Sequence, residues 1–186
     1  SRAVGDAGAL CVAYDVWLDA PALVSLQLAR NAIGDAGASA LADALGANRS
    51  LRELNMREND VCDEGAIALA RALRTNRALR VIDLRDNLVH DAGAIALADA
   101  LLANRTLAIL DLSANRVGEE GTLALAYALG ANSALTALDL ECVPRARARA
   151  RGVRGRRRGR SSDVPFPSFP PENQLSPSPP PAALSV

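Results

Sequence analysis

The sequence is poor in several residue types that catalytic and metal sites need. Of its 186 residues only 3% are aromatic, three are Cys and one is His, and Lys is absent, so all 21 basic residues are Arg. The Cys residues are odd in number and widely spaced, which fits reduced thiols and neither a disulfide framework nor a zinc site. His90 has only Asp91 beside it, and no Walker-type, HExxH, CxxC or GxSxG motif occurs. We therefore expect no enzymatic activity, no cofactor and no metal.

Membrane features are also missing. No apolar run approaches the roughly 18 residues that a membrane span requires, and no signal peptide is visible. Together with the unpaired Cys residues, these absences predict a cytoplasmic location and no membrane partner.

A repeat of 28 residues is the dominant feature of what remains. Four sets of residues keep this period, and no insertion or deletion interrupts it from Leu23 to Leu140. The sets are Leu23, Leu51, Leu79, Leu107 and Leu135; Asn31, Asn59, Asn87 and Asn115; Gly37, Gly65, Gly93 and Gly121; and Asn48, Asn76, Asn104 and Asn132. A fixed period of about 20 to 50 residues indicates a solenoid, in which each unit buries its apolar face against its neighbours.

The first half of one unit, Leu51–Ala78, has the pattern of a strand. Leu54 and Met56 have the two-residue spacing of a strand with one buried face, and Asn59 follows where the chain must turn. An Asn side chain can both donate to and accept from backbone groups, so stacked units should align these residues in a ladder.

The second half of the unit has the pattern of a helix. Gly65, Leu69, Ala72 and Leu73 form one apolar stripe at helical spacing. Acidic residues precede the stripe, where negative charge favours a helix N-terminus, and Asn76 is expected to cap the other end. Across the chain we expect strands near 25–28, 53–56, 81–84, 109–112 and 137–140, and helices centred on 37–45, 65–73, 93–101 and 121–129.

The pattern LxxLxLxxNxV followed by GAxALAxALxxN resembles the ribonuclease-inhibitor type of leucine-rich repeat, as in NOD-like receptors and Ran GTPase-activating protein. The resemblance implies an α/β horseshoe solenoid, with parallel strands inside and helices outside. It covers Leu23 to Leu140 and extends weakly to the start, where Val4 and Gly8 echo later residues at an offset of 29 positions. We expect one repeat domain over 1–142, with a degenerate unit at 1–22, full units at 23–134 and a broken unit at 135–142.

In such a solenoid, the side chains between and just after the buried strand positions should line the concave face of the sheet. The candidate partner-binding residues are Asn55, Arg57, Glu58, Asp83, Arg85, Asp86, Asp111 and Asp139. Three of them, Asp83, Asp111 and Asp139, fall on neighbouring strands about 4.8 Å apart. Like charges at this spacing repel one another, so the stripe predicts a site for a basic segment of a partner.

The helical side carries a second charged column. Asp43, Arg71 and Asp99 occupy one position of the repeat and alternate in sign. We expect them to form a lateral ladder of ion pairs, which at an exposed surface contributes about 0–1 kcal/mol each to stability.

The chain beyond the repeats is strongly basic. Residues 1–142 hold 12 Arg and 19 acidic residues, a net charge of −7, whereas residues 143–186 hold 9 Arg and 2 acidic residues, a net charge of +7. An Arg-rich segment at 143–160 is followed by a Pro/Ser-rich tail at 161–186, which is expected to be disordered. Three interpretations stay open: a nuclear-localisation or nucleic-acid-binding segment, a tail phosphorylated at Ser176 and Ser178, and translated non-coding GC-rich sequence. The matched charges also predict a salt-sensitive contact in which the tail occupies the concave face of its own repeats and inhibits binding there.

Taken together, these patterns predict a monomeric leucine-rich-repeat scaffold or recognition module that binds a protein partner on its concave face. The alternative is an activator of a small GTPase similar to Ran GTPase-activating protein. In that family an acidic segment follows the repeats, whereas the segment here is basic.

Overall fold

The computed structural model describes residues 4–17 and 23–141. The expected Arg-rich segment 143–160 and the tail 161–186 lie outside the described residues. In chain order the described elements are α1 (Gly5–Trp17), β1 (Ser25–Gln27), α2 (Asp35–Ala47), β2 (Glu53–Asn55), α3 (Asp63–Thr75), β3 (Val81–Asp83), α4 (Asp91–Ala103), β4 (Ile109–Asp111), α5 (Glu119–Ala131) and β5 (Ala137–Asp139).

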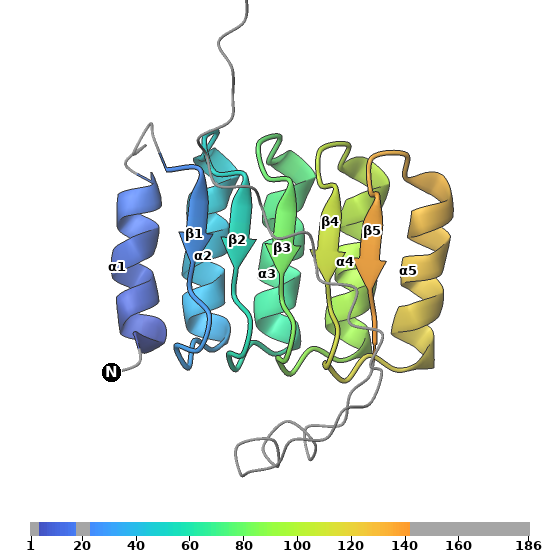
Figure 1. The fold of residues 1–186 in the computed structure, drawn as a ribbon, viewed down its shortest axis with the longest axis horizontal. Helices are drawn as coiled ribbons and strands as arrows, with labels where there is room; N and C mark the ends of the chain where they lie inside the picture. The colour runs from blue at the N-terminus through green and yellow to red at the C-terminus, as the bar shows by residue number, and fades with distance from the viewer. Residues whose placement is uncertain (1–3, 18–22, 142–186) are drawn as a thin grey trace, which may run out of the picture. The chain divides into compact units, whose positions relative to one another are not determined.

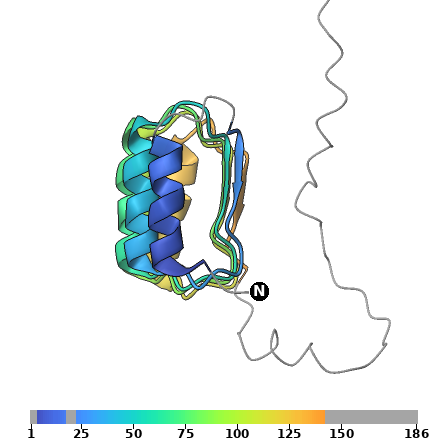
Figure 2. The same cartoon turned by 90° about the vertical axis from the view of Figure 1, so that its left-hand side faces the viewer.

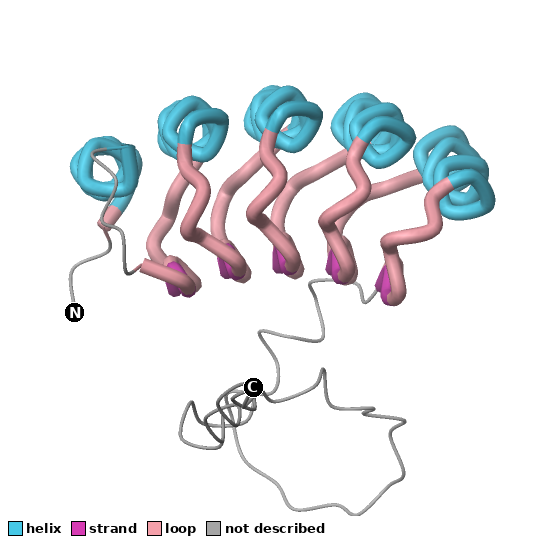
Figure 3. Tube along the Cα trace, turned by 90° about the horizontal axis from the view of Figure 1, so that it is seen from above, coloured by secondary structure: helices cyan, strands magenta, loops and turns pink. Residues whose placement is uncertain are grey.

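The strands form one parallel sheet in the order β1-β2-β3-β4-β5 (Figure 1). All helices pack on one face of this sheet, so the repeats form two layers (Figure 2). Seen from above, the strands line the inner side of the row of repeats and the helices line its outer side (Figure 3). Each strand pairs with the next at a register of 28 residues, as in Leu26↔Leu54 and Leu54↔Ile82. The predicted α/β repeat solenoid is confirmed.

The predicted elements agree closely with the observed ones. Each strand starts where the two-residue pattern predicts and ends one residue earlier, and each of the four predicted helices extends two residues further at both ends. Within the described ranges, no helix combines the length and the apolar character that crossing a bilayer would need.

The core lies between the sheet and the helices. Leu54 and Met56 from β2 and the following residues are 1% and 0% exposed, and Leu69 and Leu73 of α3 are 1% and 2% exposed. Small residues let neighbouring helices approach closely. A Cβ atom added at Gly93 of α4 would lie 2.9 Å from the Cβ of Ala66 in α3, closer than real Cβ atoms pack, so this position requires glycine.

The predicted Asn ladder is present and joins each unit to the one before it. Asn59 is 2% exposed. Its Nδ2 donates to the carbonyl oxygens of Leu28 at 2.9 Å and Met56 at 2.8 Å, and its Oδ1 accepts the N–H groups of Asn31 and Ile33, both at 3.0 Å. Because these groups are buried in the turn, leaving them unpaired would cost free energy.

The acidic residues at the helix starts cap the helix of the next unit. Asp63 is the first residue of α3, yet its Oδ1 accepts the N–H groups of His90 at 2.8 Å and Gly93 at 3.0 Å, at the start of α4. The residue before α3, Cys62, makes no side-chain capping bond. The same carboxylate position is filled by Asp6, Asp35 and Asp91. The expected favourable charge is therefore present, but it acts across the boundary between units.

Asn76 stands at the end of α3, as predicted; its Oδ1 accepts the N–H groups of Ala78 and Leu79, and its Nδ2 bonds the previous unit. Its backbone N–H bonds Ala72 within α3, while its Nδ2 donates to the Leu45 carbonyl oxygen of α2 at 2.7 Å. The backbone of Asn76 is extended and not left-handed. In α2, α3 and α4, a carbonyl group near the end of the helix is therefore satisfied by an amide from the unit that follows.

The N-terminal helix α1 takes the place of a repeat helix. Asp6 Oδ1 accepts the N–H groups of Gly34 at 2.7 Å and Gly37 at 3.0 Å, the same contact that Asp35 makes one repeat later along the array. The offset of 29 residues noted in the sequence thus preserves the contact between units.

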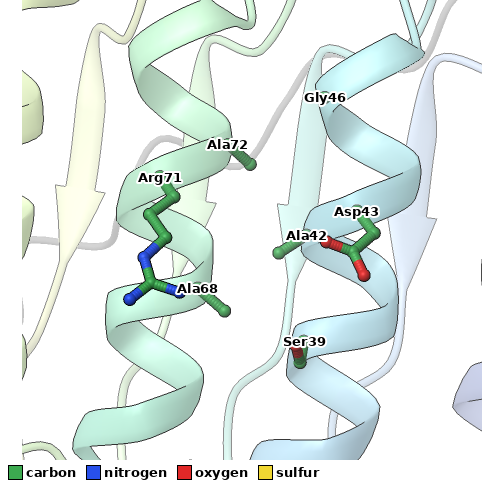
Figure 4. Close-up of a pocket in the computed structure, with 7 residues that line it drawn as sticks. All are labelled: Ser39, Ala42, Asp43, Gly46, Ala68, Arg71 and Ala72. Atoms are coloured by element: carbon green, nitrogen blue, oxygen red, sulfur yellow. The ribbon is translucent and has the colours of Figure 1, made fainter.

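The predicted ladder of ion pairs on the helices is wrong. Among the described residues, Arg71 forms no ion pair with Asp43 or Asp99, and all three side chains are exposed. A cavity of about 250 Å³ lies between α2 and α3, with Asp43 and Arg71 on opposite sides of it and small residues along its walls (Figure 4). Solvation of exposed charges offsets most of the attraction that would draw them together.

Candidate functional site

The candidate site is the solvent-facing side of the sheet, on which one column of polar residues crosses all five strands. The register pairs Asn55 with Asp83, Asp83 with Asp111 and Asp111 with Asp139, and Gln27 precedes them on β1. The structure thus brings the three predicted Asp residues together on neighbouring strands, as the sequence predicts.

Asn55 and the three Asp residues of this column also close a turn, a role that was not predicted from the sequence. The side-chain Oδ1 accepts the backbone N–H two residues later in every case: Asn55 from Arg57 at 3.0 Å, Asp83 from Arg85 at 2.9 Å, Asp111 from Ser113 at 2.8 Å and Asp139 from Glu141 at 2.9 Å. The signal was the recurrence of Asn or Asp at this position, since both favour such turns. Asn55 indicates that a neutral amide fills the position equally well.

The three carboxylates differ in burial. Asp83 and Asp139 are half-buried, whereas Asp111 is only 2% exposed and also accepts the Ser113 hydroxyl at 2.6 Å. Burial raises the pKa of Asp83 and of Asp111 above the usual range, because it disfavours the charged form. A neighbouring carboxylate raises each pKa further: Asp111 acts on Asp83, and Asp139 acts on Asp111.

Cations lie near this column without pairing with it: Arg57 and Arg85 act on Asp83, and Arg85 acts on Asp111, and each of them lowers the pKa of the carboxyl group. None of the three Asp side chains forms an ion pair there. The described ranges also contain no group of three or more His, Cys, Asp or Glu residues suited to hold a metal ion. The described part of the molecule therefore offsets the negative charge of the column only in part.

The charged residues just beyond the strands form a rim, and unlike the Asp column this rim contains ion pairs. Two guanidinium N–H groups of Arg30 donate to the Glu58 carboxylate at 2.7 and 2.8 Å, and Arg57 Nε lies 3.0 Å from it. The hydrogen bond from Arg30 lowers the pKa of Glu58. Glu58 and Asp86 both have left-handed backbone, with φ of 54°, so their position is fixed by the turn.

Of the other predicted residues on this rim, Arg85 is exposed and Arg57 is half-buried. Glu58 is already held by arginines of its own chain. Among the predicted rim residues, Arg85 is therefore the one that is exposed to a partner.

An apolar strip lies beside the acidic column, and the sequence analysis did not include it. Val81 and Ile109 stand two residues before Asp83 and Asp111, so they point to the same face of the sheet. Ile109 is half-buried and Val81 is 9% exposed. The face thus combines an apolar strip with a charged column, a composition that suits a polypeptide partner.

The family model described as "Leucine Rich repeat" matches residues 21–42, 47–70, 75–98 and 103–126, which together are just over half of the chain. The chain belongs to the leucine-rich-repeat family. As a leucine-rich-repeat protein it has the architecture of a protein-interaction module. The ribonuclease-inhibitor type named above stays a prediction that is compatible with this match.

Two solved structures have the same fold. One is "Leiomodin-1 Actin-Binding Site 2 (ABS2)", at 20% identity and a TM-score of 0.65, covering 75% of this chain and 83% of that one. The other is the tropomodulin C-terminal domain of Caenorhabditis elegans, at 14% identity and a TM-score of 0.65, covering 77% of this chain and 89% of that one. No curated protein sequence gave a significant match. At these identities the likeness extends to the fold and no further.

Proposed function

We propose that this leucine-rich-repeat protein recognises a protein partner through the inner face of its sheet, where it binds a basic segment. The observation that carries the proposal is the column of Asp83, Asp111 and Asp139, three neighbouring carboxylates with no ion-pair partner among the described residues. A basic side chain laid across the column would relieve the repulsion between them. It would also form charge-assisted hydrogen bonds, which are stronger than neutral ones.

Accessibility assigns the three carboxylates different parts. Asp83 and Asp139 are half-buried and can contact a partner directly. Asp111 is buried and adds to the negative electrostatic potential between them. Arg85 and the apolar pair Val81 and Ile109 border the column and would contact the partner's backbone and apolar side chains. Five strands at about 4.8 Å each give a face roughly 20 Å across, which is enough for a short extended segment.

Substituting Asp by Asn tests the proposal without disturbing the turns, because Asn55 already makes the same backbone bond. Binding to a panel of basic peptides, measured by fluorescence anisotropy, should weaken about 10-fold or more in Asp83→Asn/Asp139→Asn, since each charged hydrogen bond contributes about 1.5–3 kcal/mol. The matched control is Asp43→Asn/Asp99→Asn on the helical side, which should bind like the parent. Equal binding by both double variants would remove the inner face from consideration.

Actin is the first protein partner to test, because the leiomodin structure is titled as an actin-binding site. Co-sedimentation with filaments and anisotropy with monomeric actin, with the same two double variants, would establish whether actin uses the proposed face. We place the protein in the cytoplasm as a non-enzymatic monomer, which imaging and analytical ultracentrifugation can check.

The alternative is activation of a small GTPase, as in Ran GTPase-activating protein. A GTP-hydrolysis assay with a panel of small GTPases separates the two functions. Acceleration of hydrolysis would favour the alternative, whereas binding without acceleration agrees with the proposal.

A further inference from the structure

The last helix, α5, presents a flank that the other repeat helices bury. In α2, α3 and α4 the residues that face the next helix are buried. Ala66 and Leu73 of α3, for example, are 0% and 2% exposed. The equivalent residues of α5 are Thr122, which is exposed, and Leu129, which is 42% exposed. Leu123, on the same helix, is 63% exposed. α5 is the last helix of the described row (Figure 3), so this flank has no neighbour there.

The last unit also departs from the repeat at the positions that couple one unit to the next. Asp91 of α4 accepts the N–H groups of Gly118 and Gly121 at the start of α5, and Asp fills this position in every earlier unit. In α5 the position holds Glu119, followed by Glu120, and Thr122 replaces the Ala that lies against the next helix. The Glu side chain is one methylene longer than Asp, so its carboxylate can reach a partner further from the helix start.

The length of the connections shows where the chain would go next. Seven residues separate the end of β2 from α3, the end of β3 from α4, and the end of β4 from α5. The same length after Asp139, the end of β5, leads to Arg147. The sequence around this point, Arg145 to Arg151, alternates Arg with Ala. A chain following the path of the earlier units would therefore carry Arg side chains past the start of α5.

We propose that the segment from Arg145 to Arg151 docks on the open flank of α5, where Arg147 and Arg149 pair with Glu119 and Glu120. Guanidinium groups bind carboxylates in a planar, two-bond geometry, and their aliphatic stems can cover an apolar side chain such as Leu123. Because the segment is tethered only a few residues beyond β5, its local concentration at this flank is high, about the mM range. A second copy of the chain would have to compete with this tethered segment.

Hydrogen exchange of the α5 amides in the full chain tests the contact. We expect Glu119→Gln/Glu120→Gln to speed exchange about 5- to 10-fold, and Arg147→Gln/Arg149→Gln to do the same. Combining all four substitutions should add little further, because each pair already removes the contact. The charge-swapped chain, with Arg at 119 and 120 and Glu at 147 and 149, should recover the parent rate. Salt at 1 M should bring the parent to the rate of the variants.

Two controls separate this contact from general charge effects. Glu64→Gln removes an exposed carboxylate at the position of α3 that corresponds to Glu120, and should leave α5 exchange unchanged. Arg154→Gln/Arg156→Gln removes the same charge further along the chain and should have a smaller effect than the pair at 147 and 149.

Three results would overturn the proposal. If the Glu119/Glu120 and Arg147/Arg149 substitutions have additive effects on α5 exchange, the two pairs of side chains are not in contact. If the exchange rate of the α5 amides falls as the protein concentration rises, and does not change on substitution of Arg147 and Arg149, the flank binds a second copy of the chain. If neutralising Arg147 and Arg149 changes the amide exchange rates of β3, β4 and β5 only, the segment lies on the inner face of the sheet. None of these readouts requires a partner protein, so the proposal can fail while the proposed binding function stands.

Discussion

At the scale of single residues, the repeat is held by a few side chains whose polar atoms are fully used. Asn87 is 1% exposed. Its Nδ2 donates to the carbonyl oxygens of Met56 at 3.0 Å and Leu84 at 2.9 Å, and its Oδ1 accepts the Val61 N–H at 3.0 Å. One side chain therefore satisfies turn groups in its own unit and in the unit before it.

We predict that Asn87→Ala lowers the free energy of unfolding by at least about 1–3 kcal/mol, because it leaves buried backbone groups unpaired. Arg85→Ala, two residues away on the exposed rim, should change it by less than about 0.5 kcal/mol. Urea unfolding of both variants measures the difference. Equal, small effects would contradict the structural role of the Asn ladder.

The buried carboxylates of the inner face predict a pH dependence of stability. Burial raises the pKa of Asp83 and Asp111 in the folded state above the unfolded value of about 3.9. The folded state therefore binds protons more tightly than the unfolded state, so the contribution of these groups is favourable at low pH and is lost as the pH rises through the folded pKa. In Asp83→Asn/Asp111→Asn, stability relative to the parent should increase between pH 4 and pH 7. A constant difference in melting temperature over this range would contradict it.

At the scale of helices and strands, contact between units depends on glycine at one helical position and tolerates larger residues at another. A Cβ at Gly93 would lie 2.8 Å from the Asp63 carboxylate and 2.9 Å from both Ala66 and Val89, whereas a Cβ at Gly46 would meet nothing within 4 Å. Both residues lie inside helices, α4 and α2. The pair therefore separates packing from helix propensity.

We predict opposite effects for the two substitutions. Gly93→Ala should destabilise by about 1–3 kcal/mol through overpacking, while Gly46→Ala should stabilise by about 0.5–1 kcal/mol, because Ala loses less conformational freedom in a helix. Thermal unfolding monitored by circular dichroism measures both. Stabilisation by both substitutions would mean that the helices can separate without cost.

The element boundaries could be predicted because each unit repeats its apolar pattern in a fixed register. The direction of the contacts between units could not, since the position of Asp63 in the repeat does not reveal whether it caps α3 or α4. The repeat period placed Asp43 and Arg71 in one column, but it did not reveal that their side chains lie too far apart to form an ion pair. On the inner face the sequence predicted the acidic column, but it did not reveal that Asp111 is buried and accepts the Ser113 hydroxyl, because burial depends on packing in three dimensions.

At the scale of the whole molecule, each unit of the described repeats contacts only its neighbours, so stability should be local. Asn132 links α5 to the unit before it, through bonds to the carbonyl oxygens of Leu101 at 2.6 Å and Asn104 at 2.9 Å. Helix-to-helix contacts link only α1 to α2, α2 to α3, α3 to α4 and α4 to α5. Disturbance at one end should therefore fade along the row.

We predict that Asn132→Ala speeds hydrogen exchange in α4 and α5 while α1 and α2 keep the parent rates. The loss of two bonds at the end of α4 opens that end of the row without disturbing distant interfaces. Mass spectrometry of peptides from the full chain resolves the individual helices. A uniform rise in exchange from α1 to α5 would mean that the repeats unfold as one cooperative block.

On the ribosome, a unit of this protein cannot complete its contacts when only its own 28 residues have emerged. The Val61 N–H receives its acceptor only when Asn87 appears, while the start of the helix at Asp63 is already served by the earlier residue Asp35. Folding of the nascent chain should therefore follow its emergence from the exit tunnel with a delay of one unit. In each unit the start of the helix can form its hydrogen bonds before the turn can. Synthesis at about 5–20 residues per second gives each turn a wait of a few seconds, during which only the newest unit is open to proteases and chaperones.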